Sequence, residues 1–208
     1  MQCGPIQARV DPKKIAKERP FKHRVHFRDT GFAVSGTESD LSIQQLYTML
    51  TQDHRRNRLI LEEIRRSVTA GHSPLVLTER VEHVEILAQQ LESRIRNVIV
   101  LKGSLGKRQR DAAADRMKSI AAHEERVILA TGRYIGEGFD DARLDTLFLA
   151  LPISWRGTLQ QYVGRLHRLH GNKHEVRVFD YVDGNIPMLF RMYQKRLRGY
   201  HALGYTTD

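Results

Sequence analysis

The larger part of the chain shows a regular alternation of short apolar runs and longer amphipathic segments. Runs rich in Val, Ile and Leu predict strands at residues 75–77, 97–101, 127–130, 146–150 and 175–181. Apolar positions at helical spacing predict helices at residues 81–91, 107–121 and 158–169, and a last helix at residues 186–203. Apolar strands separated by helices are typical of a parallel sheet that is covered on both faces. The pattern therefore predicts a doubly wound α/β domain.

The first 70 residues follow a different pattern. Residues 21–34 alternate well enough to form one exposed strand or the arm of a hairpin. Two apolar stripes predict two helices, the first with Asp40 or Ser42 as its cap. The stripes consist of Ile43, Leu46, Tyr47 and Leu50, and of Leu59, Ile60, Ile64 and Val68. We therefore expect residues 1–70 to form an irregular and helical connector, and residues 71–208 to form the α/β domain with its C-terminal helix.

The amino-acid composition limits the cellular environments and the kinds of binding partner that are compatible with this chain. The 34 Lys and Arg exceed the 24 Asp and Glu by ten charges, which makes phosphate-bearing partners plausible. Cys3 is the single cysteine and excludes an internal disulfide, so a reducing, cytoplasmic setting fits best. The sequence has no apolar stretch near the 18 residues that a membrane span needs, and residues 1–20 lack the apolar core of a signal peptide. We expect a soluble chain without a membrane partner.

Glycines follow the strand predicted at residues 127–130. Gly132, Gly136 and Gly138 permit positive φ and a close approach of a ligand to the backbone. An ordinary connection between a strand and a helix has the same composition, so these glycines alone do not decide between the two interpretations.

The helix predicted at residues 158–169 groups two arginines. At about 100° per residue, Gln161, Arg165 and Arg168 fall within roughly 60° of one another. Gly164 lies beside the arginines, and Gly171 is expected to stop the helix. Apolar residues occupy the other side, namely Leu159, Tyr162, Val163, Leu166 and Leu169. The polar face can stabilise charge on a phosphoryl group, or it can be a solvated basic surface.

The sequence lacks a complete nucleoside-triphosphate site. Residues 103–107 (GSLGK) are not a P-loop, because only two residues separate the glycines and Arg108 follows the lysine. A carboxylate pair that would hold Mg²⁺ after an apolar strand is also lacking. His167, His170 and His174 do not have metal-ligand spacing, and we expect no metal site.

These signals become specific when they are taken together, because their order and separation resemble the C-terminal RecA-like lobe of superfamily 2 helicases. The matching segments are 74–91 (PLVLTERVEHVEILAQQL, motif IV), 98–110 (VIVLKGSLGKRQR, the strand, glycine turn and helix that follow), 130–140 (ATGRYIGEGFD, motif V) and 161–168 (QYVGRLHR, motif VI). Motif VI has the pattern Q-x-x-G-R-x-x-R. Motif V has one residue more between Ala-Thr and Glu-Gly than many relatives. The resemblance covers about residues 71–183 and is nearest to DEAD/DEAH-like helicases related to type III restriction subunits and XPB-like enzymes.

The resemblance implies an ATP site shared between two lobes. In the family, ATP with Mg²⁺ is bound mainly by a first, N-terminal lobe, which carries the P-loop. Arg165 and Arg168 would be arginine fingers that reach the γ-phosphate, and Gln161 would position them. The residues implied to border the nucleotide in this lobe are Glu137, Gly138, Asp140 and Gly164.

The resemblance also implies that this lobe binds the backbone of DNA or RNA. The residues implied to lie toward that backbone are Thr78, Arg80, Gly103 and Thr131. Phosphate contacts add affinity without reading sequence, so base specificity is not expected.

The function that the resemblance implies is an ATP-dependent helicase or translocase lobe. Residues 1–70 are too short to be a first lobe and resemble an inter-lobe connector, so Met1 is expected to be an internal methionine or the start of a truncated reading frame. We expect the chain alone not to hydrolyse ATP. The alternatives are a non-catalytic RecA-like module that binds nucleic acid or protein, and a dinucleotide-binding oxidoreductase, which the absence of G-x-G-x-x-G disfavours.

Overall fold

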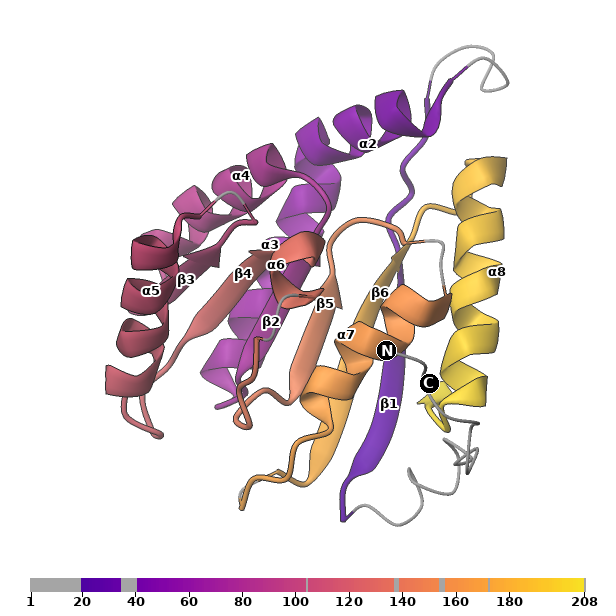
Figure 1. The fold of residues 1–208 in the computed structure, drawn as a ribbon. Helices are drawn as coiled ribbons and strands as arrows, with labels where there is room; N and C mark the ends of the chain where they lie inside the picture. Colours follow the sequence, from indigo (N-terminus) through magenta and orange to yellow (C-terminus); the bar gives the residue numbers. More distant parts are fainter. Residues whose placement is uncertain are drawn as a thin grey trace, which may run out of the picture.

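The computed structural model contains one seven-stranded sheet with helices on both faces (Figure 1). It describes residues 20–34, 41–103, 105–136, 139–153, 156–171 and 173–207. The strands are β1 (Lys22–Asp29), β2 (Pro74–Thr78), β3 (Val98–Leu101), β4 (Val127–Thr131), β5 (Thr146–Leu149), β6 (Glu175–Val182) and β7 (Thr206–Thr207). The helices are α2 (Ile43–Gln52), α3 (His54–Thr69), α4 (Val81–Glu92), α5 (Lys107–Ser119), α6 (Gly132–Gly136), α7 (Arg156–Leu166) and α8 (Pro187–Ala202).

The strand order is β3-β4-β2-β5-β6-β1-β7, and every described pair of neighbouring strands is parallel. The five strands predicted from apolar runs correspond to β2 through β6. The predicted doubly wound α/β fold is therefore confirmed. The short helix α6 was not predicted, because five residues are too few to show a helical period.

Successive residues of the central strands pack into two separate hydrophobic cores, one on each face of the sheet. In β2, Leu75 and Leu77 pack with α5, α6, α7 and α8, while Val76 between them packs with α3 and α4. Side chains along a strand alternate between the faces of a sheet, so an apolar run fills both cores. The helix α7, which carries Arg165, therefore lies on the opposite face from α3 and α4.

The front segment is part of the same sheet. Strand β1 pairs in parallel with β6 from Lys22↔Glu175 to Asp29↔Val182 and also pairs with β7, so the expectation of an exposed strand or a hairpin arm is wrong. Ser42 is the N-cap of α2 and forms a capping box with Gln45, as one of the two predicted caps. The boundary expected near residue 70 falls between α3 and β2, and the sheet and the core continue across it.

Two buried ion pairs fasten helices to the carboxyl ends of β5 and β6. Arg56 of α3 donates from Nε to Asp183 Oδ1 at 3.0 Å and from Nη1 to the Ala150 carbonyl at 2.6 Å. Arg196 of α8 donates from Nε to Asp180 Oδ2 at 2.7 Å. All four side chains are almost fully buried, so each charge depends on its partner.

The terminal helix predicted at residues 186–203 is α8, and its apolar side covers the sheet beside α7 (Figure 1). Leu189 and Met192 of this helix are buried, Leu197 is half-buried, and Arg196 is buried through its ion pair with Asp180. Among the described residues, no helix is long and apolar enough to span a membrane.

Candidate nucleotide and nucleic-acid site

The two arginines of the predicted motif VI are each bound to the loop that follows β4. Arg165 donates from Nη2 to the carbonyl of Ile135 at 3.1 Å. Arg168 donates from Nε to Asp140 Oδ1 at 3.1 Å. Ile135 belongs to α6 and Asp140 lies four residues beyond the end of this helix, so the two arginines bind two separate points of the segment that follows β4. The predicted link between Asp140 and the arginines is present in the structure.

The grouping of the arginines does not come from one continuous helix. Helix α7 ends at Leu166, so the expected stop at Gly171 is wrong and Arg168 lies two residues beyond the helix. The physical reason is Lys173, whose buried ammonium group donates to the carbonyls of Leu166 and Arg168 at 2.8 and 2.7 Å. A lysine at this place satisfies carbonyls that the helix leaves open and ends the helix early.

Four of the predicted residues line one open pocket of about 800 Å³. They are Gln161, Gly164, Arg165 and Arg168, and their neighbours in the lining include Ala142 and His167. A Cβ atom added at Gly164 would meet no atom within 4 Å. Nothing in the described part of this chain therefore requires a glycine there, although glycine inside a helix costs about 0.5–1 kcal/mol relative to alanine.

The chemistry of this pocket suits an anionic phosphate group. Each guanidinium group has five N–H donors, and the contacts to Ile135 and Asp140 use one donor of each arginine. The pocket lining contains both arginines and no carboxylate. Within the described ranges, no group of three His, Cys, Asp or Glu side chains could hold a metal ion. Glu137 and Gly138, predicted to border the nucleotide, lie outside the described residues.

The residues predicted to face nucleic acid gather at the carboxyl ends of three adjacent strands. Thr78 at the end of β2 pairs in register with Thr131 at the end of β4. Gly103, just after β3, donates its N–H to Thr131 Oγ1 at 3.0 Å. Ligands of open parallel sheets bind beyond this edge. The structure therefore places Thr78, Gly103 and Thr131 together where a ligand of this fold class binds.

A hydrogen-bonded chain leads from Thr78 into the layer of α3 and α4. Thr78 Oγ1 lies 3.1 Å from His83 Nδ1, and His83 Nε2 lies 2.9 Å from Asn57 Oδ1. Asn57 Nδ2 donates to the Thr51 carbonyl at 2.8 Å, so its Oδ1 must accept from His83 Nε2–H. His83 Nδ1 is then the acceptor and the Thr78 hydroxyl is the donor. Burial, followed by the charge of Arg56, lowers the pKa of His83 to about 3, which keeps the ring neutral.

No local sequence pattern predicts this chain of hydrogen bonds, because Asn57 and His83 are 26 residues apart. Thr78 and Thr131 are both buried, with 3% and 6% of their surface exposed, and both hydroxyl groups have partners within the protein. Their direct contact with a nucleic-acid backbone stays a prediction. What the geometry supports directly is that both threonines fix the turns at this edge.

Arg80 lies on the surface of the same edge. Its Nη2 donates to Gln44 Oε1 at 2.5 Å and to the Gln44 carbonyl at 3.2 Å, and its guanidinium lies 6.0 Å from the ring centre of Tyr47. These contacts hold Arg80 against α2. The residue is partly exposed to solvent.

A contact that the sequence did not suggest joins the turn after β2 to α7. Tyr162 donates from Oη to Glu79 Oε1 at 3.3 Å, and burial together with the Glu79 charge raises the pKa of Tyr162. Gly132 lies against this pair, since a Cβ atom there would overlap the Tyr162 hydroxyl. The nucleic-acid edge and the arginine helix are thus connected through packed side chains.

Comparison with known proteins agrees with this architecture. Residues 55–170, more than half of the chain, match the family described as the helicase conserved C-terminal domain. The putative helicase 161L of Invertebrate iridescent virus 6 is 27% identical over 204 residues, which cover 92% of this chain and 44% of that protein. The transcript termination protein A18 of Fowlpox virus (strain NVSL) is 26% identical over 157 residues, covering 74% of this chain and 33% of that protein. The chain thus spans less than half the length of these relatives.

Two solved structures have a similar fold. The crystal structure of T4 UvsW superposes with a TM-score of 0.68 at 16% identity, over 91% of this chain and 41% of that one. Dbp5 of S. cerevisiae, solved with RNA and ADP BeF3, superposes with a TM-score of 0.56 at 16% identity, over 96% and 42% of the two chains. The chain therefore belongs to the helicase conserved C-terminal domain family, and its fold is that of the C-terminal RecA-like lobe of superfamily 2 helicases.

Proposed function

We propose that this chain is the second lobe of an ATP-dependent nucleic-acid helicase or translocase. In this proposal ATP with Mg²⁺ is bound mainly by a first lobe, which belongs to the same longer chain or to a separate one. Arg165 and Arg168 supply positive charge to the phosphates, and the edge formed by Thr78, Arg80, Gly103 and Thr131 holds a nucleic-acid backbone.

The observation that carries the proposal is the pocket that joins Gln161, Gly164, Arg165 and Arg168. Charge that develops on a transferring phosphoryl group is stabilised best by donors that are already in place. The bonds to Ile135 and Asp140 hold the two guanidinium groups in place, and among the described residues they engage one donor of each arginine. The open space above Gly164 gives a partner surface room to approach α7 closely.

The strand edge at Thr78 and the arginine pocket on α7 are connected through packed side chains. Such a connection suits a lobe that couples nucleotide binding to nucleic-acid binding. The Glu79–Tyr162 bond ties the turn after β2 to α7. In this proposal, closure of the two lobes on ATP moves α7 and the edge together, because they pack as one body. Dbp5, which shares the fold, was solved with RNA and ADP BeF3, and this supports both ligand classes for the present chain.

The test is reconstitution with a first lobe that carries a P-loop. We expect the 208-residue chain alone to show no sustained ATPase activity, and the mixture to show nucleic-acid-stimulated ATPase. Arg165→Gln and Arg168→Gln should each lower the rate of the mixture by about 10³-fold, the usual contribution of an arginine finger. Arg191→Gln on the exposed side of α8 is the matched control and should leave the rate unchanged.

Two results would contradict the proposal. Sustained ATPase from the chain alone, abolished by Arg165→Gln, would mean that this lobe carries a complete site. No restoration by a first lobe that binds the chain tightly would instead favour a non-catalytic module that binds nucleic acid or protein.

A further inference from the structure

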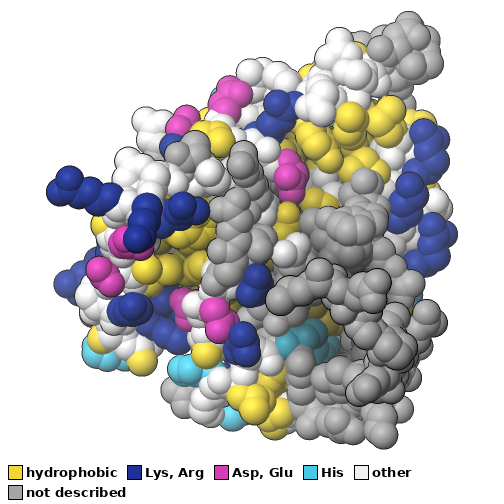
Figure 2. Space-filling model, in the orientation of Figure 1, with side chains coloured by type: hydrophobic (Ala, Val, Ile, Leu, Met, Phe, Trp, Pro, Cys, Tyr) yellow, Lys and Arg dark blue, Asp and Glu magenta, His cyan; other side chains and the backbone are white. Residues whose placement is uncertain are grey.

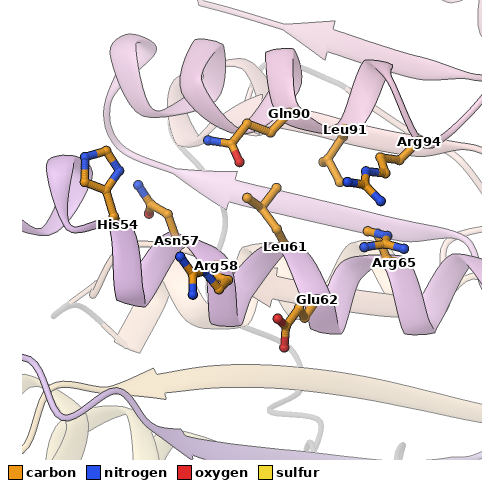
Figure 3. A pocket seen from close by; sticks show the side chains of 9 residues that line it. All are labelled: His54, Asn57, Arg58, Leu61, Glu62, Arg65, Gln90, Leu91 and Arg94. Atoms are coloured by element: carbon orange, nitrogen blue, oxygen red, sulfur yellow. The ribbon is translucent and has the colours of Figure 1, made fainter.

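A groove with an excess of positive charge runs between α3 and α4, on the face of the sheet opposite α7 (Figure 3). Its volume is about 300 Å³. The arginines of the groove are Arg58 and Arg65 from α3 and Arg94 just after α4. In Figure 3, Arg65 and Arg94 approach one another from the two sides of the groove.

The three groove arginines have no ion-pair partner among the described residues. Glu62 is the single acid in the lining, so the groove has two more positive charges than negative ones, and Figure 3 shows Glu62 pointing away from α4. The adjacent Arg66 is different, because it lies 3.6 Å from Glu63. Cations that outnumber the acids around a hollow favour an anionic ligand.

The spacing and the floor of the groove favour a chain of phosphates. Arg58 and Arg65 are seven residues apart on α3, or about 10.5 Å along the helix axis. This corresponds to about three nucleotides at a rise of about 3.4 Å per nucleotide. Leu61 and Leu91 form the floor but are 8% and 0% exposed, so they offer almost no surface to apolar side chains of a peptide. Guanidinium groups suit phosphate oxygens well because they donate in a planar fork.

The groove begins at the edge where the structure gathers Thr78 and its neighbours. Asn57 lines the groove and is the last member of the hydrogen-bonded chain that starts at Thr78. The N-terminal part of α3 reaches the carboxyl ends of the strands, since Arg56 binds the Ala150 carbonyl after β5. The C-terminal part reaches the opposite edge, where Arg177 of β6 binds Ser67 at 3.0 Å. The buried chain of hydrogen bonds therefore links the Thr78 edge to the wall of the groove.

We propose that the α3–α4 groove is an accessory site for the sugar-phosphate backbone of a nucleic-acid strand, with Arg58, Arg65 and Arg94 as its phosphate contacts. The proposal rests on the proposed function in taking nucleic acid as the partner. It adds a second path on the face remote from Arg165 and Arg168. The groove needs neither ATP nor the first lobe in order to bind.

The test measures binding of a fluorescent single strand of about 20 nucleotides, as DNA and as RNA, to the 208-residue chain without ATP. Arg58→Gln, Arg65→Gln and Arg94→Gln are combined in one variant. The matched control combines Arg191→Gln, Lys195→Gln and Arg198→Gln, because all three are exposed cations of α8 and their removal changes the net charge equally. Figure 2 shows Lys and Arg side chains gathered over α8. Thermal unfolding of both variants checks that they fold.

We expect the groove variant to bind at least about tenfold more weakly and to lower the slope of log K against log salt by about 2. The α8 control should change affinity by less than about threefold. Replacing the same three groove arginines by lysine should restore most of the salt slope, because lysine keeps the charge. A groove variant that stays folded and regains its slope with lysine would establish phosphate contact at this place.

Equal losses in the groove and α8 variants would overturn the proposal, since only the net charge would matter. The same holds if polyglutamate binds through the groove arginines while their removal leaves oligonucleotide affinity unchanged, because the groove would then be a site for acidic peptide. These outcomes leave the proposed function intact. Failure of the wild-type chain to bind either oligonucleotide would overturn both the groove and the proposed nucleic-acid edge, but not the test of Arg165.

Discussion

Arg168 and Asp140 are joined by a hydrogen bond of 3.1 Å between Nε and Oδ1, across 28 residues of sequence. The bond connects the turn after α7 to the loop after α6, which are the two segments predicted to meet at a nucleotide. Both side chains are exposed, by 59% and 48%, so the pair is well placed to orient a guanidinium group and poorly placed to stabilise the fold.

Asp140→Asn should therefore separate activity from stability. We expect the free energy of unfolding to change by less than about 1 kcal/mol, because an exposed ion pair contributes little. The ATPase rate of the chain combined with a first lobe should fall at least about tenfold, because an uncharged amide oxygen holds the Arg168 guanidinium less firmly than a carboxylate does. Denaturant unfolding and steady-state ATPase assays measure the two effects. A rate that stays at the wild-type value would show that Asp140 does not position Arg168.

Gly164→Ala should stabilise the chain and impair the site. A Cβ atom at Gly164 meets nothing within 4 Å, so the substitution should add about 0.5–1 kcal/mol to the free energy of unfolding. The same methyl group occupies the space that a partner surface or nucleotide needs, so the reconstituted ATPase should decrease. Chemical denaturation and the reconstituted assay test the two parts, and an alanine variant with full activity would contradict the second.

Gly132→Ala is the contrasting control, because the same change there meets a filled space. Its Cβ atom would overlap the Tyr162 hydroxyl, and overpacking of this kind costs about 1–3 kcal/mol. Adding Tyr162→Phe removes the overlapping oxygen and should recover part of the loss in a thermal melt. An unchanged melting temperature in Gly132→Ala would show that α7 moves aside freely.

The buried His83 predicts a loss of stability in weak acid. Its pKa is lowered from 6.5 to about 3 in the folded chain, so the unfolded chain takes up the proton first as the pH falls. The contribution of neutral His83 to the free energy of unfolding is fully present above pH 6.5. This contribution is lost progressively between pH 6.5 and about pH 3. Between pH 7.5 and pH 5 the loss from this residue should be about 2 kcal/mol.

Denaturant unfolding at several pH values tests this prediction. His83→Gln can accept and donate hydrogen bonds without titrating, so its stability should depend less on pH over that range. His201→Gln changes an exposed histidine of α8 and serves as the control. Parallel pH curves for the wild-type chain and His83→Gln would contradict the assigned neutral state.

Arg56→Gln should be among the most destabilising single changes. Arg56 and Asp183 are both 0% exposed, and removal of the guanidinium leaves the Asp183 charge buried without its partner. We expect a loss of about 3–5 kcal/mol. Arg58→Gln changes an exposed arginine two residues further along α3 and should shift stability by less than about 0.5 kcal/mol. Equal effects of the two variants in urea unfolding would contradict the assignment.

Local patterns were sufficient to locate most elements. The strands β2 to β6 and the helices α4, α5 and α8 lie within a few residues of their predicted bounds, because apolar runs and helical spacing are properties of neighbouring residues. The end of α7 was misplaced, because Lys173 acts on that end from outside the helix. Strand β1 was recognised as a strand but not as a partner of β6, which follows it by more than 140 residues.

The sequence by itself determined the fold class and the spacing of the motif residues, because both depend on patterns among residues that are close together in the sequence. It identified Arg165, Gly164 and Gln161 as a group, and the structure places them in one pocket. Only the tertiary structure decided the different roles of Arg56 and Arg58, which lie two residues apart in the sequence. Arg56 forms a buried ion pair with Asp183, which is 127 residues away in the sequence, whereas Arg58 lines the groove between α3 and α4. The distinction depends on which distant elements pack against each face of α3, and no local periodicity contains that information.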